Sequence, residues 1–275
     1  MGFDLGHTAS SLSKLVLRTK RKLDNNRTKD NEDSFQMICQ EFNNNKLIKK
    51  YEGYTQNNHF KVGLSGKTVY IYDHEENELA RFQDVLYMYR GKFIPNTNIL
   101  VVKSTSGWLL FYDLDKLELI KKIRFSNIGS QDENFDITQD GKYLYNIEAP
   151  EFTTRTRLTK YDLKTLKPII ASFYDLDKVF LKYVEIDNDC IYLFGFIRNN
   201  KGVKDYNFIG LYKEMEEKCG IQGVKKLDEN FYNQIYQYKV CEDYGFTQKS
   251  LKYRHLEKIE DLEKITIKDA YQHIK

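Results

Sequence analysis

The chain has 275 residues, of which 41% are hydrophobic and 30% charged, a composition that excludes a low-complexity polymer and can supply a sizeable core. Its formal net charge is only +3, so no global electrostatic field argues for a polyanionic partner, and any electrostatic recognition must be local. Aromatic residues make up 14% of the chain, mostly Tyr and Phe, which favours half-buried strands over helices.

Residues 1–34 differ from the rest of the sequence. Within Ser11–Leu23 a short predicted helix places Leu12, Leu15 and Val16 on one face. The basic residues of this segment lie elsewhere on it: Lys14, Arg18, Lys20, Arg21 and Lys22. Two interpretations stay open, contact of these cations with nucleic acid or an anionic membrane surface, or a short helix that packs on the domain or frays.

Asp24–Ser34 follows this helix and contains no hydrophobic residue, which predicts a linker. We therefore divide the chain into an N-terminal helical or disordered appendage, residues 1–34, and one domain, residues 35–275. From Phe35 the pattern favours strands, and Met37–Tyr51 places an asparagine run between two strand-like pieces. The stretch Phe60–Phe82 holds a further strand pattern whose place within a repeat stays open.

A phrase made of a strand, a polar turn and a second strand recurs along the domain. It is clearest at Leu109–Ile123 and Leu158–Ser172, where Tyr112 and Tyr161 mark the end of the first strand. Looser copies lie around Tyr72, Tyr212 and Tyr253, at intervals of about 40 to 51 residues. A period in this range that is built from strands predicts the blades of a β-propeller.

Turns divide the middle of the chain into three consecutive units of four strands each. The turn between the first and second strands is marked by Pro95 in one unit, by Asp140 and Gly141 in the next, and by Asp187–Asp189 in the third. A long loop is predicted between the second and third strands of each unit.

Phe135–Ile147 followed by Lys160–Ile169 resembles the WD-repeat and related β-propellers, over roughly residues 60–260. The likeness is one of pattern, because Tyr112-Asp113 and Tyr161-Asp162 stand where that family has Trp-Asp, and no functional residue is carried over. The resemblance implies a single all-β propeller, and at ~40 to 50 residues per blade the domain would hold five or six four-stranded blades.

The C-terminal stretch His255–Ile265 fits two structures. Leu256, Ile259 and Leu262 recur every three residues on a charged background, which suits a helix, while the position of the stretch within the period favours a final hairpin. We predict the hairpin, with a last strand at Ile265–Ile267 that closes the ring.

The sequence motifs predict no catalytic residue, no metal site and no cofactor. Gly66-Lys67-Thr68 lacks the earlier glycine and the following helix of a phosphate-binding loop. The histidines lack the helical spacing that would place two imidazoles on one metal ion. Paired aspartates such as Asp113 and Asp115 fall in turns, where their side chains bond to nearby backbone amides.

Cysteine usage and hydropathy bear on location. The cysteines lie far apart and form no Cys-x-x-Cys pair, which favours a reducing compartment over a zinc site or a disulfide framework: Cys39, Cys190, Cys219 and Cys241. No stretch approaches the ~18 apolar residues of a membrane span, and the N-terminus lacks the pattern of a secretory signal. We therefore expect a soluble, cytoplasmic protein.

The loops between second and third strands are the predicted binding surface, because in propellers such loops emerge on one face. They span Lys103–Trp108, Glu148–Arg157 and Phe196–Asn207. Their aromatic and basic side chains suit a protein hot spot or an anionic group: Trp108, Phe152, Arg155, Arg157, Arg198, Lys201, Lys204 and Tyr206. Trp108 has a second interpretation, packing between blades.

The sequence thus predicts a non-catalytic module that binds another protein, with an acidic surface, through one propeller face. Two alternatives stay open. One is a hydrolase or lactonase-like metalloenzyme with carboxylate ligands at the central channel. The other is a nucleic-acid or membrane-surface binder that acts through residues 14–22.

Overall fold

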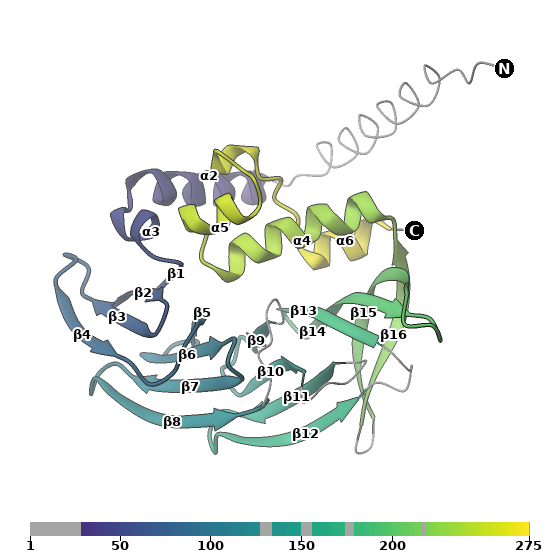
Figure 1. Ribbon diagram of the computed structural model, residues 1–275, viewed down its shortest axis with the longest axis horizontal. Helices are drawn as coiled ribbons and strands as arrows, with labels where there is room; N and C mark the ends of the chain where they lie inside the picture. The colour runs from purple at the N-terminus through teal and green to yellow at the C-terminus, as the bar shows by residue number, and fades with distance from the viewer. Residues whose placement is uncertain (1–28, 127–133, 150–155, 174–178, 216–217, 275) are drawn as a thin grey trace. The chain divides into compact units, whose positions relative to one another are not determined.

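The computed structural model describes residues 29–126, 134–149, 156–173, 179–215 and 218–274 (Figure 1). The chain forms two compact units, residues 1–44 and 45–275. In the first unit the described residues form helix α2, Lys29–Asn44, which runs across the predicted boundary at residue 34. The division of the chain at that boundary stays a prediction. All further elements belong to the second unit.

The strands form four antiparallel sheets of four strands each, and within each sheet the strands pair in sequence order. The first sheet contains β1 (Gly53–Gln56), β2 (Lys61–Ser65), β3 (Thr68–Tyr72) and β4 (Glu78–Phe82). The second contains β5 (Met88–Phe93), β6 (Ile99–Ser104), β7 (Trp108–Asp113) and β8 (Glu118–Arg124). The third contains β9 (Phe135–Ile137), β10 (Tyr143–Glu148), β11 (Arg157–Asp162) and β12 (Lys167–Phe173). The fourth contains β13 (Val179–Asp187), β14 (Cys190–Arg198), β15 (Lys204–Met215) and β16 (Lys218–Leu227).

The repeated tyrosine occupies equivalent positions in three sheets. Tyr72, Tyr112 and Tyr161 lie at or next to the end of a third strand, and the pairing of that strand with the fourth shifts register immediately before each of them. In the hairpin turns that follow, Leu117 and Leu166 both adopt the left-handed conformation, with φ of 53° and 52°. The strand repeat is therefore confirmed at these copies.

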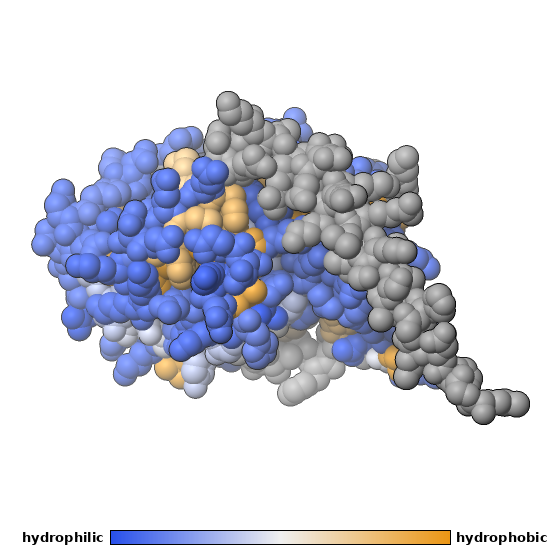
Figure 2. Space-filling model, turned by 90° about the horizontal axis from the view of Figure 1, so that it is seen from above, coloured by the Kyte–Doolittle hydropathy of each residue, from blue (hydrophilic) through white to orange (hydrophobic). Residues whose placement is uncertain are grey.

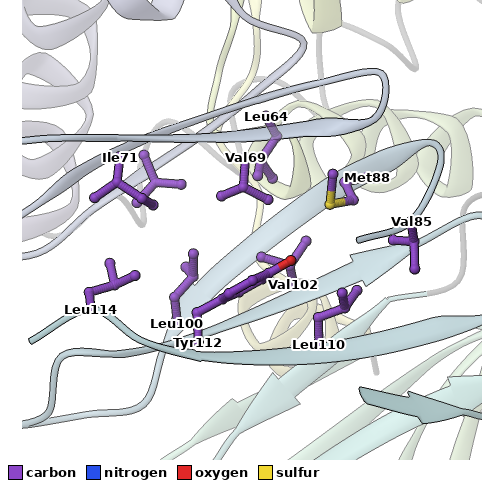
Figure 3. Packing of buried hydrophobic residues seen from close by; sticks show 11 residues of the cluster. Leu64, Val69, Ile71, Val85, Met88, Leu100, Val102, Leu110, Tyr112 and Leu114 are labelled. Atoms are coloured by element: carbon purple, nitrogen blue, oxygen red, sulfur yellow. The ribbon is translucent and has the colours of Figure 1, made fainter. Parts of the chain in front are cut away.

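Successive sheets pack face to face. Between the first and second sheets, the apolar side chains include Val69, Ile71, Leu100, Leu110 and Tyr112, which Figure 3 shows turned toward one another. A second cluster joins the second and third sheets, and a third cluster joins the third and fourth. Four-stranded sheets stacked in this way make an all-β, propeller-like arrangement. Across the described residues the sheets stay separate, and no sheet closes on itself.

A short helix, α3 (Lys46–Lys50), precedes the first sheet, so the strands predicted within Met37–Tyr51 are wrong. The asparagine run supplies a helix cap, since the Asn45 side chain accepts from Leu47 N at 2.8 Å. Tyr51, at the end of α3, stacks on Tyr70 at 4.9 Å between ring centroids. A Cβ at Gly63 would lie 2.2 Å from the Tyr51 ring, so this contact requires glycine there.

The C-terminal part of the chain is helical, so the predicted final hairpin and the strand at Ile265–Ile267 are wrong. It contains α4 (Glu229–Asp243), α5 (Gln248–Tyr253), the 3-10 helix η1 (Ile259–Asp261) and α6 (Ile267–His273). The copy of the repeat around Tyr253 is also wrong, because this residue ends α5. Asp228 caps α4 by accepting from Phe231 N at 2.8 Å.

Residues from the helical segments pack on the outward faces of the two terminal sheets. In β3, Tyr70 lies on the face opposite Val69 and Ile71, which contact the second sheet, and Tyr51 packs on this outward face. In β14, Phe194 lies opposite Leu193 and stacks on Tyr232 of α4 at 4.6 Å. The predicted count of five or six blades is not confirmed, because within the described residues the segments assigned to further blades form these helices.

Candidate functional site

The three predicted loops join second and third strands, as expected. They connect β6 to β7, β10 to β11 and β14 to β15. Phe152 and Arg155 lie outside the described residues, so their role stays a prediction. The other predicted binding residues fall into two groups, those held by contacts within the fold and those on the surface.

Trp108 begins β7 and packs partly buried against the apolar cluster between the first and second sheets. Two cations from the neighbouring strand β8 lie over its indole ring. Lys122 Nζ is 4.5 Å from the ring centroid and the Arg124 guanidinium carbon is 5.2 Å from it. Packing between sheets is therefore confirmed for Trp108. The two cations over its ring place aromatic and basic side chains together at the end of β7 that follows the loop.

Arg157 is engaged inside the fold. Its Nη2 and Nε donate to Glu148 Oε2 at 2.6 and 2.9 Å, and Tyr161 Oη donates to the other oxygen of Glu148 at 2.8 Å. The Glu148 carboxylate is fully buried. A buried carboxylate needs such partners, so the primary task of Arg157 is to neutralise Glu148.

Arg198 ends β14 on an aromatic stack. The rings of Phe180 and Phe196 are parallel within 1°, with centroids 5.0 Å apart. The Arg198 guanidinium carbon lies 4.3 Å from the Phe180 centroid. The loop that follows exposes Lys201 and Val203, the latter with 60% of its surface accessible. This end of the fourth sheet therefore presents a cation, an aromatic stack and an exposed apolar residue together.

Lys204 and Tyr206, at the start of β15, contact neighbouring elements. Lys204 Nζ donates to both oxygens of Glu229 in the first turn of α4, at 2.9 and 2.7 Å. Lys226 Nζ lies 4.1 Å from the Tyr206 ring centroid, and Tyr206 packs on the cluster between the third and fourth sheets. These contacts assign both residues a part in positioning α4 and β16.

The inner strands carry charged residues that sequence reasoning missed. Together with charged residues of α4 they make up what we call the inner-strand charge cluster. Its members from the strands are Arg90, Lys92, Asp136 and Glu185, and its members from α4 are Lys239, Glu242 and Asp243. Arg90 pairs with Asp243, Lys92 with Asp136, and Lys239 with both Glu185 and Glu242. The sequence did carry a signal for this cluster in β5. Arg90 and Lys92 are two residues apart, so both side chains lie on one face of the strand.

Electrostatics within this cluster favour the charged forms. Burial alone would raise the pKa of Asp136, but the charges of Lys92 and Arg90 outweigh it and hold the pKa below its ordinary value. Burial alone would lower the pKa of Lys239, but Glu185 and Glu242 outweigh it and raise the pKa. The cluster is therefore a set of compensated charges, in which Lys92 and Asp136 join two inner strands while the pairs of Arg90 with Asp243 and of Lys239 with Glu185 join α4 to the inner strands.

Other features of the described residues add no stronger site. A groove of about 420 Å³ lies between the β9–β10 and β13–β14 turns, and Asp140 in its lining is bound by Lys142 and Thr138, which lower its pKa to about 2. No three His, Cys, Asp or Glu side chains in the described part of the chain are grouped as metal ligands would be.

None of the described helices is both long and apolar enough to cross a membrane. Figure 2 shows one face of the molecule, where hydrophilic residues predominate.

Comparison with known proteins shows a fold shared with a solved structure and a short sequence match to a curated protein. No protein-family model matches the chain. A stretch of 71 residues is 31% identical to the U3 small nucleolar RNA-associated protein 7 of Saccharomyces cerevisiae, covering 26% of this chain and 13% of the yeast protein.

Among solved structures, Kuenenia stuttgartiensis hydrazine synthase is similar over 62% of this chain and 51% of its own, with a TM-score of 0.51 and 15% identity. The dihydro-heme d1 dehydrogenase NirN is similar over 62% of this chain and 34% of its own, with a TM-score of 0.47 and 19% identity. At such identities the likeness to hydrazine synthase shows a shared fold and no shared activity. The chain is thus defined as a propeller-like, all-β protein.

Proposed function

We propose that this protein is a non-catalytic, cytoplasmic interaction module that binds an acidic protein partner through its loops between second and third strands. The observation that carries the proposal is the stack of Arg198 on Phe180 and Phe196 beside the exposed Lys201 and Val203. An arginine held over aromatic rings presents a cation at a defined position, and arginine and aromatic residues recur in protein hot spots.

The inner-strand charge cluster supports the same interpretation indirectly. In a propeller enzyme the polar side chains of the inner strands would face substrate or metal. Here Arg90, Lys92 and Glu185 are paired with side chains of the protein itself. The β14–β15 loop therefore offers a more accessible set of charged side chains than the inner strands do.

One alternative has a specific observation in its favour. The yeast protein with the 71-residue match is described as RNA-associated, and residues 14–22 carry the basic segment predicted from the sequence. We keep RNA binding through that segment as the second candidate function. It would show as a steep loss of affinity with added salt.

The experiment compares the native chain with two charge-reversal variants. Arg198→Glu/Lys201→Glu changes the loop surface, and Lys164→Glu changes an exposed turn between β11 and β12. The tagged full chain is used to capture cross-linked partners from cells of its own source. Circular dichroism and thermal unfolding verify that both variants fold, since Arg198→Glu also removes a half-buried cation from the Phe180 ring.

The proposal expects one captured protein, with an acidic surface, to be lost with Arg198→Glu/Lys201→Glu and retained with Lys164→Glu. Equal capture by the loop variant, or loss only with Lys164→Glu, would contradict it.

A further inference from the structure

A second surface lies where the first sheet connects to the second, and of its residues only Trp108 belongs to the predicted loops. The residues of this connector patch are Leu86, Tyr87, Trp108, Lys122 and Arg124. Leu86 and Tyr87 are consecutive in the β4–β5 connection, with 53% and 63% of their surfaces exposed. Two adjacent large apolar side chains turned to water point to an interaction site rather than to a packing role.

The backbone of this connection is strained. Tyr87 has a φ of 57°, in the left-handed region that bulky residues rarely adopt. Seven other described residues besides glycine have positive φ, and each lies in a hairpin turn within a sheet or just after a helix. Within the described residues Tyr87 is thus distinctive, because its conformation is not demanded by a hairpin or a helix end.

The second sheet holds the connection in this conformation. Thr105 N donates to Tyr87 O at 3.0 Å, and Ser106 Oγ donates to Leu86 O at 3.1 Å. Ser104 Oγ also donates to Leu86 O. These three successive residues, at the end of β6 and in the loop after it, fix the backbone. The outward direction of the two apolar side chains is therefore built into the fold.

The patch carries positive charge beside its apolar residues. Lys122 Nζ donates to Asp84 O at 2.7 Å and lies over Trp108, which places the cation next to the connection. Arg124 lies over the same indole. The nearby Asp84 carboxylate is partly exposed, and it accepts from Tyr112 Oη at 3.0 Å. The two charged side chains over Trp108 are both cations.

We infer that the connector patch binds an acidic protein segment that carries a large apolar side chain. The apolar side chain would pack on Leu86 and Tyr87 while carboxylates meet Lys122 and Arg124. A base could not stack on Trp108, because two cations and the core already cover its ring, and the aliphatic Leu86 beside Tyr87 suits an apolar side chain better than a base. The inference is independent of the loop surface at Arg198.

The probe is a phage-displayed library of random linear peptides, selected on the immobilised full chain. Selected peptides are then measured on the native chain and on Leu86→Ser/Tyr87→Asn, where asparagine tolerates the left-handed backbone. The matched control is Ile169→Ser, which removes an apolar side chain of 51% exposure on β12 of the third sheet. A second variant, Lys122→Gln/Arg124→Gln, removes only the charge.

We expect selected peptides to combine Asp or Glu with Leu, Phe or Trp. They should bind Leu86→Ser/Tyr87→Asn about tenfold more weakly and Ile169→Ser unchanged. With Lys122→Gln/Arg124→Gln the affinity should fall and depend less on salt.

Failure to select acidic-apolar peptides, or equal binding to Leu86→Ser/Tyr87→Asn, would overturn the inference. Binding of labelled polyuridylate that is lost in the same variant, with no peptide selected, would assign the patch to nucleic acid instead. Peptides that lose binding only with Arg198→Glu/Lys201→Glu would support the proposed function and overturn this inference.

Discussion

The carboxylate of Glu185 on β13 accepts from Lys239 Nζ on α4 at 2.8 Å. The same carboxylate accepts from the backbone N–H groups of Ile267 and Lys268 at the start of α6, at 3.1 and 3.0 Å. One side chain of an inner strand thus binds two helices that are far away in sequence. This relationship explains how the C-terminal segment is held on the fourth sheet.

Replacing Glu185 tests this relationship. Glu185→Ala should lower the free energy of unfolding by about 3 kcal/mol, because it removes a carboxylate from the buried Lys239 and an acceptor from α6. Glu185→Gln should lose less, since an acceptor oxygen remains. Urea denaturation measures both. Glu118→Ala, at an exposed pair with Lys116, should cost less than ~1 kcal/mol, and a cost equal to that of Glu185→Ala would contradict the assignment.

The hydroxyl groups of the repeated tyrosines should contribute different amounts to the free energy of unfolding. Tyr161 Oη donates to the fully buried Glu148, whereas Tyr112 Oη donates to Asp84, which is partly exposed. Tyr161→Phe should therefore destabilise the protein by about 2 kcal/mol and Tyr112→Phe by less. Thermal and urea unfolding of the two variants give the comparison. The opposite order would show that the position of the tyrosine within the repeat matters more than its partner.

Acid should weaken the inner-strand charge cluster. Burial raises the pKa values of Asp136 and Glu242, but neighbouring cations outweigh it and hold both below their ordinary values. A carboxyl with a lowered folded-state pKa stabilises the fold above its unfolded-state pKa of about 4, and this stability is lost as the pH falls through the folded-state pKa. Urea midpoints measured from neutral to acid pH should fall less steeply for Asp136→Asn than for the native chain. Equal slopes would exclude Asp136 as a contributor.

The cysteines report on the fold of the fourth sheet and α4. Cys190, at the start of β14, is exposed, while Cys241 in α4 is buried, and burial raises the pKa of its thiol to about 11. A maleimide reagent at neutral pH should therefore modify Cys190 well before Cys241, as read by peptide mass spectrometry. In denaturant the difference should disappear. Rapid modification of Cys241 in the native chain would mean that α4 is not packed as described.

The strands of the middle region were predictable from the sequence because turn residues mark them. Asp140 and Gly141 sit in a hairpin turn, and Tyr112 and Tyr161 end equivalent strands, as expected. The helices were not predicted because tyrosines favour strands by propensity. In α4, however, Tyr232, Ile235 and Tyr238 recur every three residues and are buried, and the Asp228 cap precedes them. That helical spacing was the stronger signal.

The candidate site was predictable only in part. The loops lie between second and third strands as expected, but charge alone could not show which cations are already paired. Arg157 is held by Glu148 and Lys204 by Glu229, contacts that depend on the folded geometry. Leu86 and Tyr87 were missed because exposure of an apolar residue is not visible in a sequence pattern.

The most direct test of the arrangement is amide hydrogen exchange on the full chain, read separately for α4 and β13. Because Glu185 binds Lys239 and the Tyr183 ring packs edge-on against Tyr236, these two elements should open together, with equal free energies of opening. That result would establish α4 as a fixed part of the fold that covers the inner strands. Exchange in α4 about tenfold faster than in β13 would contradict it, because the helix would then open by itself and uncover the inner strands.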